Sequence, residues 1–158
     1  MFTGPIFLSD VVAQVESGRR VEAVRFEKGD YLGFGCRQDV LRKIIARNPS
    51  CSPETAGMIY WTSWGLFQLM GFNLYGSFID FSNPLLEFWR DPEQQLTVFR
   101  KFISDAAYQD TDASTWQPSQ WAAFARFYNG PGNVADYTNR LRVAYDDLSK
   151  QQQQEKTS

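Results

Sequence analysis

One glutamate occupies a position suited to acid–base chemistry. Glu16 ends a short stretch, residues 8–17, whose apolar side chains recur at helical spacing, and Gly18 follows as a helix stop. The chain contains no histidine, which excludes Ser–His and Cys–His nucleophile systems and histidine metal ligands. Its two cysteines, Cys36 and Cys51, are too few for a zinc site. Acid–base work must therefore fall on carboxylates, tyrosine or lysine, and we expect no metal or other cofactor.

Two later segments place polar groups among large apolar residues. Ser63 and Gln68 lie on either side of Gly65 in the run Ser-Trp-Gly-Leu-Phe-Gln-Leu-Met, and Tyr128 and Asn129 precede a glycine. A glycine between bulky neighbours lets the backbone approach a ligand or another segment closely. The residues alone also allow a structural interpretation, with Gln68 a satisfied buried amide, Tyr128 a core residue and Asn129 a helix C-cap.

Taken in order, the Glu16-Ser17 pair, the 63–68 segment and the 128–130 segment resemble three motifs of the lysozyme superfamily. The resemblance is closest to the phage-type N-acetylmuramidases, the endolysin family, with goose-type lysozymes and lytic transglycosylases as cousins. It runs from about Leu8 to about Leu148. It implies an enzyme that cleaves the glycan backbone of peptidoglycan between N-acetylmuramic acid and N-acetylglucosamine.

The resemblance also implies a role for each matching residue. Glu16 becomes the general acid, which must keep its proton near neutral pH and therefore needs apolar surroundings. Ser63 and Gln68 become polar groups facing the sugar cleft. Tyr128 lies beside the acid, where its phenol could bond the carboxyl, and Asn129 reaches an N-acetyl sugar.

Glu16 and Ser17 have alternative interpretations as well. Without the other motifs, Glu16 reads as a solvated glutamate at a helix end. Ser17 either bonds back to its own helix or makes a hydrogen bond near the site. The sequence leaves both interpretations of Ser17 open.

A second carboxylate is harder to place. Glu27 follows Phe26, which resembles the Phe-Glu pair that comes after Glu-Ser in phage muramidases, and Glu22 and Asp30 are the other candidates. The chain departs from the family here in two ways. The loop before Phe26 is shorter and lacks a glycine-rich stretch, and residues 28–29 are Lys-Gly where relatives often carry a basic residue and a histidine. The alternative for Glu27 is a surface strand glutamate paired with a neighbouring cation.

The chemistry depends on that second group. A base that activates water would give a reducing sugar, as in a lysozyme. If Glu16 works without one, the acetamido group of the substrate could assist, and lytic transglycosylation would give an anhydro sugar. The sequence leaves both open.

The periodicity predicts a mostly helical α+β fold of the lysozyme kind, with one domain over residues 1–150. A small β-hairpin lobe is expected over residues 21–34, flanking the sugar cleft. In the helix that begins at Asp91-Pro92, the stripe Leu96, Phe99 and Ile103 should be buried, and Tyr137 should face inward from the last helix. The remaining helices are predicted over residues 8–17, 38–48, 53–58, 65–70, 83–89, 118–128 and 133–149. The polar residues 151–158 are expected to be disordered.

Composition narrows the setting. The net charge is −2 without a basic face, which argues against a nucleic-acid partner. No apolar run reaches the roughly 18 residues of a membrane span, so no membrane insertion is expected. We see no signal peptide at the N-terminus, and free thiols are favoured over a disulfide between Cys36 and Cys51. A wall hydrolase of this kind would reside in a phage virion or in the host cytoplasm, with release to the wall.

Two classes of function follow. The leading one is a peptidoglycan hydrolase, either a phage endolysin or a virion-associated lysin. Its expected partners are glycan strands and, for a virion-associated lysin, other virion proteins. The alternative is a catalytically degraded lysozyme-like protein that binds sugar or serves as a structural virion component. The shortened loop favours the alternative, whereas the three intact motifs favour the enzyme.

Overall fold

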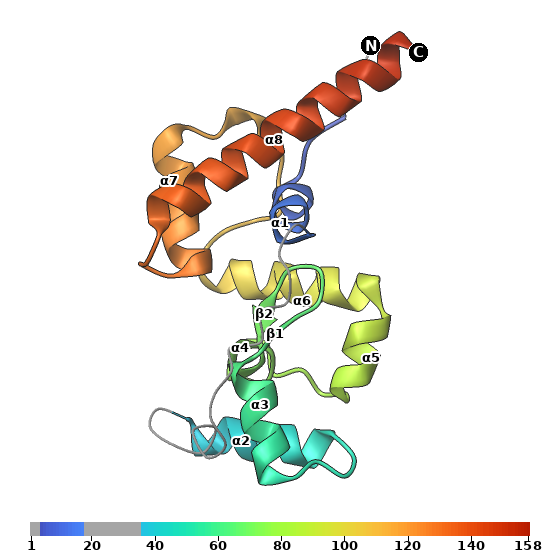
Figure 1. The fold of residues 1–158 in the computed structure, drawn as a ribbon, viewed down its shortest axis with the longest axis vertical. Helices are drawn as coiled ribbons and strands as arrows, with labels where there is room; N and C mark the ends of the chain where they lie inside the picture. The colour runs from blue at the N-terminus through green and yellow to red at the C-terminus, as the bar shows by residue number, and fades with distance from the viewer. Residues whose placement is uncertain (1–3, 18–35) are drawn as a thin grey trace. The chain divides into compact units, whose positions relative to one another are not determined.

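The computed structural model describes residues 4–17 and 36–158, and Figure 1 shows them as a mostly helical chain with one short two-stranded sheet. This confirms the predicted α+β class. The chain forms two compact units. The first contains the N-terminal helix and the chain from Tyr108 onward, and the second contains the chain between them. Each unit is described by itself.

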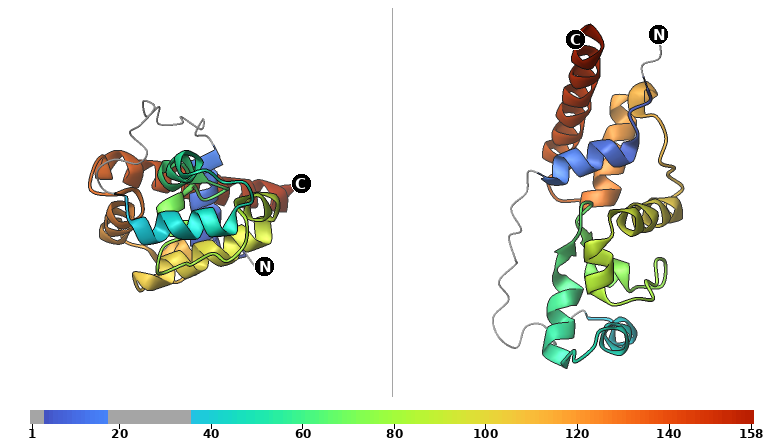
Figure 2. Two further views of the ribbon diagram at one scale, coloured as in Figure 1. Left: turned by 90° about the horizontal axis from the view of Figure 1, so that it is seen from below. Right: turned by 90° about the vertical axis from the view of Figure 1, so that its right-hand side faces the viewer.

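The first unit is built around its last helix. Helices α1 (Leu8–Ser17) and α7 (Pro118–Asn129) both pack against α8 (Val134–Thr157), and Figure 2 shows this packing from two further sides. A 3-10 turn, η2 (Ala113–Thr115), precedes α7. The helices bury an apolar interior whose fully buried members include Leu8, Val11, Val12, Phe124 and Leu141. Burial of such a face, rather than intrinsic propensity, supplies most of the stability of short helices.

The ends of these helices follow local signals. Pro118 occupies the first turn of α7, Gln117 and Gln120 form a capping box there, and Gly130 ends the helix with φ +85°. Helix α8 is longer than predicted. It continues to Thr157, so the segment expected to be a disordered tail is helical instead. Gln, Glu and Lys are good helix formers, and neither glycine nor proline interrupts them there.

Over its described residues, 36–107, the second unit holds six shorter elements and a long helix. They are α2 (Gln38–Arg47), α3 (Pro53–Trp61), β1 (Ser63–Trp64), β2 (Leu69–Met70), α4 (Gly71–Leu74), α5 (Leu85–Arg90) and α6 (Pro92–Asp105). The predicted start of α6 is confirmed, because Asp91 Oδ1 accepts the backbone N–H groups of Glu93 and Gln94 at 3.0 and 3.3 Å. Its buried stripe is Gln95, Val98, Phe99 and Ile103, whereas Leu96 is only half-buried.

Residues 65–70, predicted to be a buried helix, belong to a β-hairpin instead. Strand β1 pairs antiparallel with β2, with Ser63 opposite Met70 and Trp64 opposite Leu69. The connecting turn places Gly65 at φ +78° and Gln68 at φ +51°. Two left-handed residues cannot continue a right-handed helix. A short apolar run cannot by itself distinguish a buried helix from a buried strand, which explains the error.

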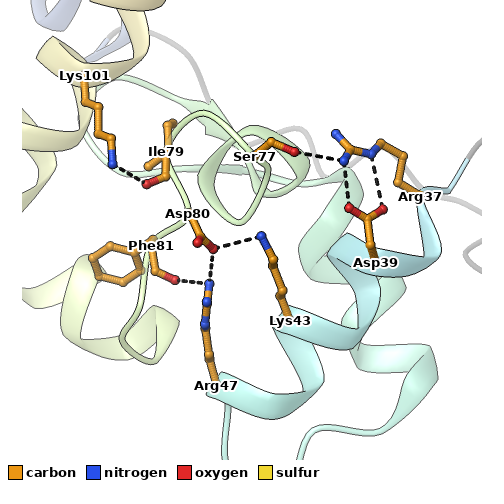
Figure 3. Close-up of polar contacts among 9 residues, drawn as sticks. All are labelled: Arg37, Asp39, Lys43, Arg47, Ser77, Ile79, Asp80, Phe81 and Lys101. Atoms are coloured by element: carbon orange, nitrogen blue, oxygen red, sulfur yellow. Dashed lines mark hydrogen bonds and ion pairs between the residues drawn. The ribbon is translucent and has the colours of Figure 1, made fainter.

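Cations hold the loop between α4 and α5 in place (Figure 3). Asp80 accepts from Arg47 at 2.7 Å and from Lys43 at 3.0 Å, both on α2. On the other side of the loop, Lys101 of α6 donates to the backbone oxygen of Ile79 at 2.9 Å. These bonds fix Asp80 in a left-handed conformation with φ +48°. The loop is thus attached to two helices of its own unit.

Three further expectations concern this part of the chain. The β lobe predicted over residues 21–34 lies outside the described residues. Neither Cys36 nor Cys51 forms a disulfide, and Cys36 accepts a hydrogen bond from the indole of Trp61 at 3.2 Å. No helix within residues 4–17 and 36–158 is long and apolar enough to cross a membrane.

Candidate active site

Glu16 is a buried carboxylate near the end of α1. Only 5% of it is exposed, in a helix whose other buried residues are apolar except for Ser9. The hydroxyl of Tyr137 donates a hydrogen bond of 2.7 Å to Glu16 Oε1. Tyr137 lies in the first turns of α8 and is fully buried. The packing of α1 against α8 therefore positions the carboxyl, and the alternative of a solvated glutamate is wrong.

A stack of aromatic rings extends from this hydrogen bond. The rings of Tyr137 and Tyr128 lie 6.3 Å apart at an interplanar angle of 21°, and Tyr128 stacks on Phe124 at 5.3 Å. Tyr128 thus stacks on the tyrosine that bonds the acid, whereas a bond from its own phenol to Glu16 stays a prediction. The sequence placed Tyr137 only on the inward face of its helix. A buried tyrosine hydroxyl needs a polar partner. That requirement could have suggested that Tyr137 bonds a buried polar group such as the Glu16 carboxyl.

The neighbours of these residues follow their local geometry. The hydroxyl of Ser17 donates to the backbone oxygen of Gln14 at 2.9 Å, so it bonds back to its own helix. Asn129 is the last residue of α7 and is exposed, whereas the C-cap predicted as its alternative role falls on Gly130. Asn129 is therefore available on the surface of the first unit.

In the second unit, the hairpin carries the two predicted substrate residues. Ser63 Oγ donates to the sulfur of Met70 at 3.0 Å across the strands. Gln68 Nε2 donates to the backbone oxygen of Gly65 at 2.9 Å, which closes the turn. Both side chains are half-buried. Gln68 was expected either to contact the sugar cleft or to be a satisfied buried amide. Its amide nitrogen bonds within the turn, so part of its hydrogen-bonding capacity is used inside the protein.

Gln95 organises the same turn and was missed by the sequence reasoning. Its Oε1 accepts the backbone N–H of Leu66 at 2.8 Å, and its Nε2 donates to the backbone oxygens of Phe88 and Trp89 at 3.0 and 3.1 Å. A Cβ on Gly65 would lie 2.7 Å from Gln95 Oε1, which only a glycine avoids. The sequence does contain a signal for this role. The helical period of α6 buries position 95, and a buried glutamine needs hydrogen-bond partners.

The structure brings the predicted residues together in two groups. Glu16 and Tyr128 meet through Tyr137 in the first unit, while Ser63 and Gln68 share the hairpin of the second. Convergence of the two groups on one cleft stays a prediction. Glu27 lies outside the described residues, as do its rivals in the 21–34 segment. Within residues 4–17 and 36–158 no cluster of three or more His, Cys, Asp or Glu side chains could hold a metal ion.

Comparison with known proteins decides the family. The family model "Muramidase: N-acetylmuramidase" matches residues 39–149. The chain belongs to the N-acetylmuramidase family. It is also 34% identical over 137 residues to the endolysin of Enterobacteria phage PRD1, an alignment that covers 82% of this chain and 89% of that protein. No solved structure matches the chain.

Membership in this muramidase family confirms that the chain is a glycosidase of the peptidoglycan backbone. The matched range starts at residue 39 and includes the hairpin, Tyr128 and Tyr137. It does not reach Glu16, so the family match supports the enzyme class without assigning the acid. The roles of the individual residues remain predictions that rest on geometry.

Proposed function

We propose that this muramidase cleaves the bond between N-acetylmuramic acid and N-acetylglucosamine with Glu16 as its general acid. The observation that supports this most strongly is the 2.7 Å hydrogen bond from Tyr137 to the buried Glu16 carboxyl. A carboxyl withdrawn from water favours its neutral form, which is the form that can protonate a leaving oxygen. Burial and a fixed orientation are the two properties that the role requires.

The reaction would proceed by proton transfer from Glu16 to the glycosidic oxygen as the bond to the anomeric carbon breaks. Positive charge then develops on the sugar ring, and a carboxylate or the substrate's acetamido group stabilises it. Tyr137 bonds Glu16 Oε1 and so keeps the carboxyl in one orientation during the transfer. In this proposal Glu27 takes a proton from a water molecule, whose oxygen bonds to the anomeric carbon and gives a reducing end, and both carboxyl groups then return to their starting states by proton exchange with solvent.

Substrate contacts come from groups with spare hydrogen-bonding capacity. Ser63 and Gln68 are half-buried on the hairpin, and each has an oxygen that can accept from a sugar hydroxyl or an acetamido N–H. Asn129 is exposed at the end of α7 and offers an amide. A cleft that binds a sugar polymer works through a few convergent polar groups of this kind.

The biological setting follows from the relative. The PRD1 protein is named an endolysin, and this chain matches 89% of its length. We infer that this protein also acts on the bacterial wall during phage lysis, from the host cytoplasm or as part of the virion. Its macromolecular partner is the glycan strand of peptidoglycan, with virion proteins as further partners if the enzyme is carried in the particle.

Digestion of purified peptidoglycan tests the reaction class. The protein should lower the turbidity of a wall suspension, and mass spectrometry of the soluble products should show new sugar ends at N-acetylmuramic acid. New amino groups without new sugar ends would mean that the peptide, not the glycan, is cut. No change in turbidity would favour the degraded sugar-binding alternative.

A further inference from the structure

A second concave site lies in the second unit. A pocket of about 440 Å³ opens beside the hairpin, between the start of α3, helix α5 and the turn after α2. Its volume falls within the range of small-molecule sites. The side chains that shape it are Ile59, Trp64, Leu85, Leu86 and Trp89, with residues 48–51 and Thr55 on the rim.

Two tryptophans form adjoining walls of this pocket. The ring centroids of Trp64 and Trp89 lie 6.1 Å apart, and the ring planes meet at 84°. The indole N–H of Trp64 donates to the backbone oxygen of Ile59 at 3.1 Å, which fixes that ring. Trp89 is 52% exposed and its neighbour Leu86 is 55% exposed. Exposed apolar side chains that gather around a recess are typical of a ligand-binding groove or an interaction site.

The pocket carries no formal charge. None of its lining side chains is Asp, Glu, Lys or Arg, and burial raises the pKa of the Cys51 thiol, so that group stays neutral. The neutral polar side chains among the lining residues are those of Asn48, Ser50, Cys51 and Thr55. A site of this kind disfavours carboxylates, phosphates and ammonium groups, which lose hydration without gaining a partner. It suits a ring with an apolar face and a neutral polar edge.

We propose that the Trp64–Trp89 pocket is an additional glycan subsite that holds a neutral N-acetylglucosamine residue of the peptidoglycan strand. A pyranose presents C–H groups on its face and hydroxyls at its edge, which matches indole walls below a hydroxyl rim. The acetamido methyl adds apolar surface. N-acetylmuramic acid fits less well, because its lactyl group carries a carboxylate or a peptide.

The hairpin links this pocket to the proposed substrate residues. Successive side chains of a strand point to opposite faces, so Ser63 and Trp64 lie on opposite faces of β1. Their contacts agree, since Ser63 bonds Met70 within the hairpin while Trp64 bonds Ile59 of α3. The same hairpin thus carries a proposed substrate residue on one face and a wall of the pocket on the other. This inference rests on the proposed function, because it takes the substrate to be a glycan.

NMR of the Glu16→Gln protein tests the subsite without cleavage. The chain has five tryptophans, so five indole N–H signals are expected, and single Trp→Phe variants assign them. A hexamer of N-acetylglucosamine should shift the signals of Trp64 and Trp89 more than those of the other three. Trp89→Ala should weaken binding by roughly 5-fold or more, the loss expected of an anchoring aromatic. Trp89→Phe should retain part of the affinity.

Phe78→Ala is the matched control, because Phe78 is 61% exposed in the same unit and does not line this pocket. It should bind the hexamer as the parent does. Unchanged affinity in Trp89→Ala, or equal losses in both variants, would overturn the subsite. The subsite would also be overturned if the indole N–H signals of Trp64 and Trp89 shifted with detergent micelles but not with the hexamer. That result would indicate an apolar docking site. Full lytic activity of Glu16→Gln would instead refute the proposed acid, and the binding result would still stand by itself.

Discussion

The hydroxyl of Tyr137 donates a 2.7 Å hydrogen bond to Glu16 Oε1, although 121 residues separate the two in sequence. The pair joins the first helix of the chain to the last one. Each residue is buried, so neither can exchange its partner for water at low cost. The acid proposed for catalysis is thus positioned by a tyrosine that no motif in the sequence identified.

Tyr137→Phe tests this positioning. Without the hydroxyl, the carboxyl loses a fixed partner, and kcat should fall by about 10-fold, in keeping with a hydrogen bond to a charged group. The O–H also stabilises the ionised carboxylate. Its removal should therefore move the alkaline limb of the pH–rate profile to higher pH. The measurement is kcat against pH on solubilised glycan.

Tyr75→Phe is the control for that experiment. Tyr75 is also fully buried, and its hydroxyl donates to the backbone oxygen of Asn83 at 3.0 Å in the other unit. It should lower the free energy of unfolding but leave the shape of the pH–rate profile unchanged. If Tyr137→Phe merely destabilises the protein in the same way, Tyr137 has no part in positioning the acid.

The turn that carries Gln68 should depend on Gln95. Gln95→Leu removes the acceptor for the Leu66 N–H and the donor to two backbone oxygens. Unsatisfied buried groups of this kind cost about 1–3 kcal/mol each, so the free energy of unfolding in urea should fall by at least that much. Gln151→Leu, an exposed change on α8, should have little effect. Equal stability of the two variants would show that the hydrogen bonds of Gln95 do not matter.

Much of this architecture could be predicted because local signals determine it. The apolar spacing of residues 8–17 and the cap at Asp91 each depend on neighbours in sequence, and both were predicted correctly. The 65–70 hairpin was not, because its left-handed Gly65 and Gln68 are supported by Gln95, a residue far along the chain. Apolar character alone does not reveal such support.

The same distinction between local signals and long-range contacts applies to the candidate site. Glu16 could be proposed as the acid because its motif is local, and its burial is consistent with that proposal. The Tyr137 contact depends on how α1 packs against α8, which no spacing within either helix encodes. The predicted end of the last helix also failed, because polarity was taken for disorder where residues 151–157 have high helix propensity.

Asp80 should make stability depend on acid pH. Hydrogen bonds from Arg47, and then from Lys43, hold the pKa of Asp80 below its ordinary value of 3.8. A lowered pKa contributes stability above the unfolded value, and that contribution is lost as pH falls through the folded value. Asp80→Asn should therefore lower the free energy of unfolding at neutral pH by up to about 1 kcal/mol, since the group is partly exposed.

The difference between Asp80→Asn and the parent should shrink below pH 3.8, where the parent carboxyl also takes up a proton. Urea unfolding at neutral and acid pH measures this. Asp147→Asn, an exposed change on α8, serves as the control. A difference that grows on acidification would contradict the sign of this argument.

The second carboxylate can be tested by the product. If Glu27 activates water, the parent should release reducing ends, and the two carboxyl groups should lie roughly 6.5–9.5 Å apart. We expect Glu27→Gln to slow the enzyme less than Glu16→Gln does. Anhydro ends from the parent would show that Glu16 works without a water-activating partner. Equal losses in the two variants, with reducing ends from the parent, would instead make Glu27 essential.

The two groups of site residues should converge on one cleft. Glu16 and Tyr128 belong to the first unit and Gln68 to the second. A bound glycan should therefore contact both, and a crystal structure of the Glu16→Gln protein with a glycan oligomer measures this. A glycan that touches Gln68 while Glu16 and Tyr128 face away from it would remove the basis for a shared site.

The central claim, that Glu16 is the general acid, is tested most directly by the lysis rate of Glu16→Gln on purified peptidoglycan. Gln keeps the shape of the side chain but has no proton to give to the leaving oxygen. The rate should fall by about 10²–10⁴-fold. Glu155→Gln, the same change at an exposed position of α8, should lyse walls like the parent, and both variants should melt cooperatively. A folded Glu16→Gln protein that lyses walls at the parental rate would contradict the account.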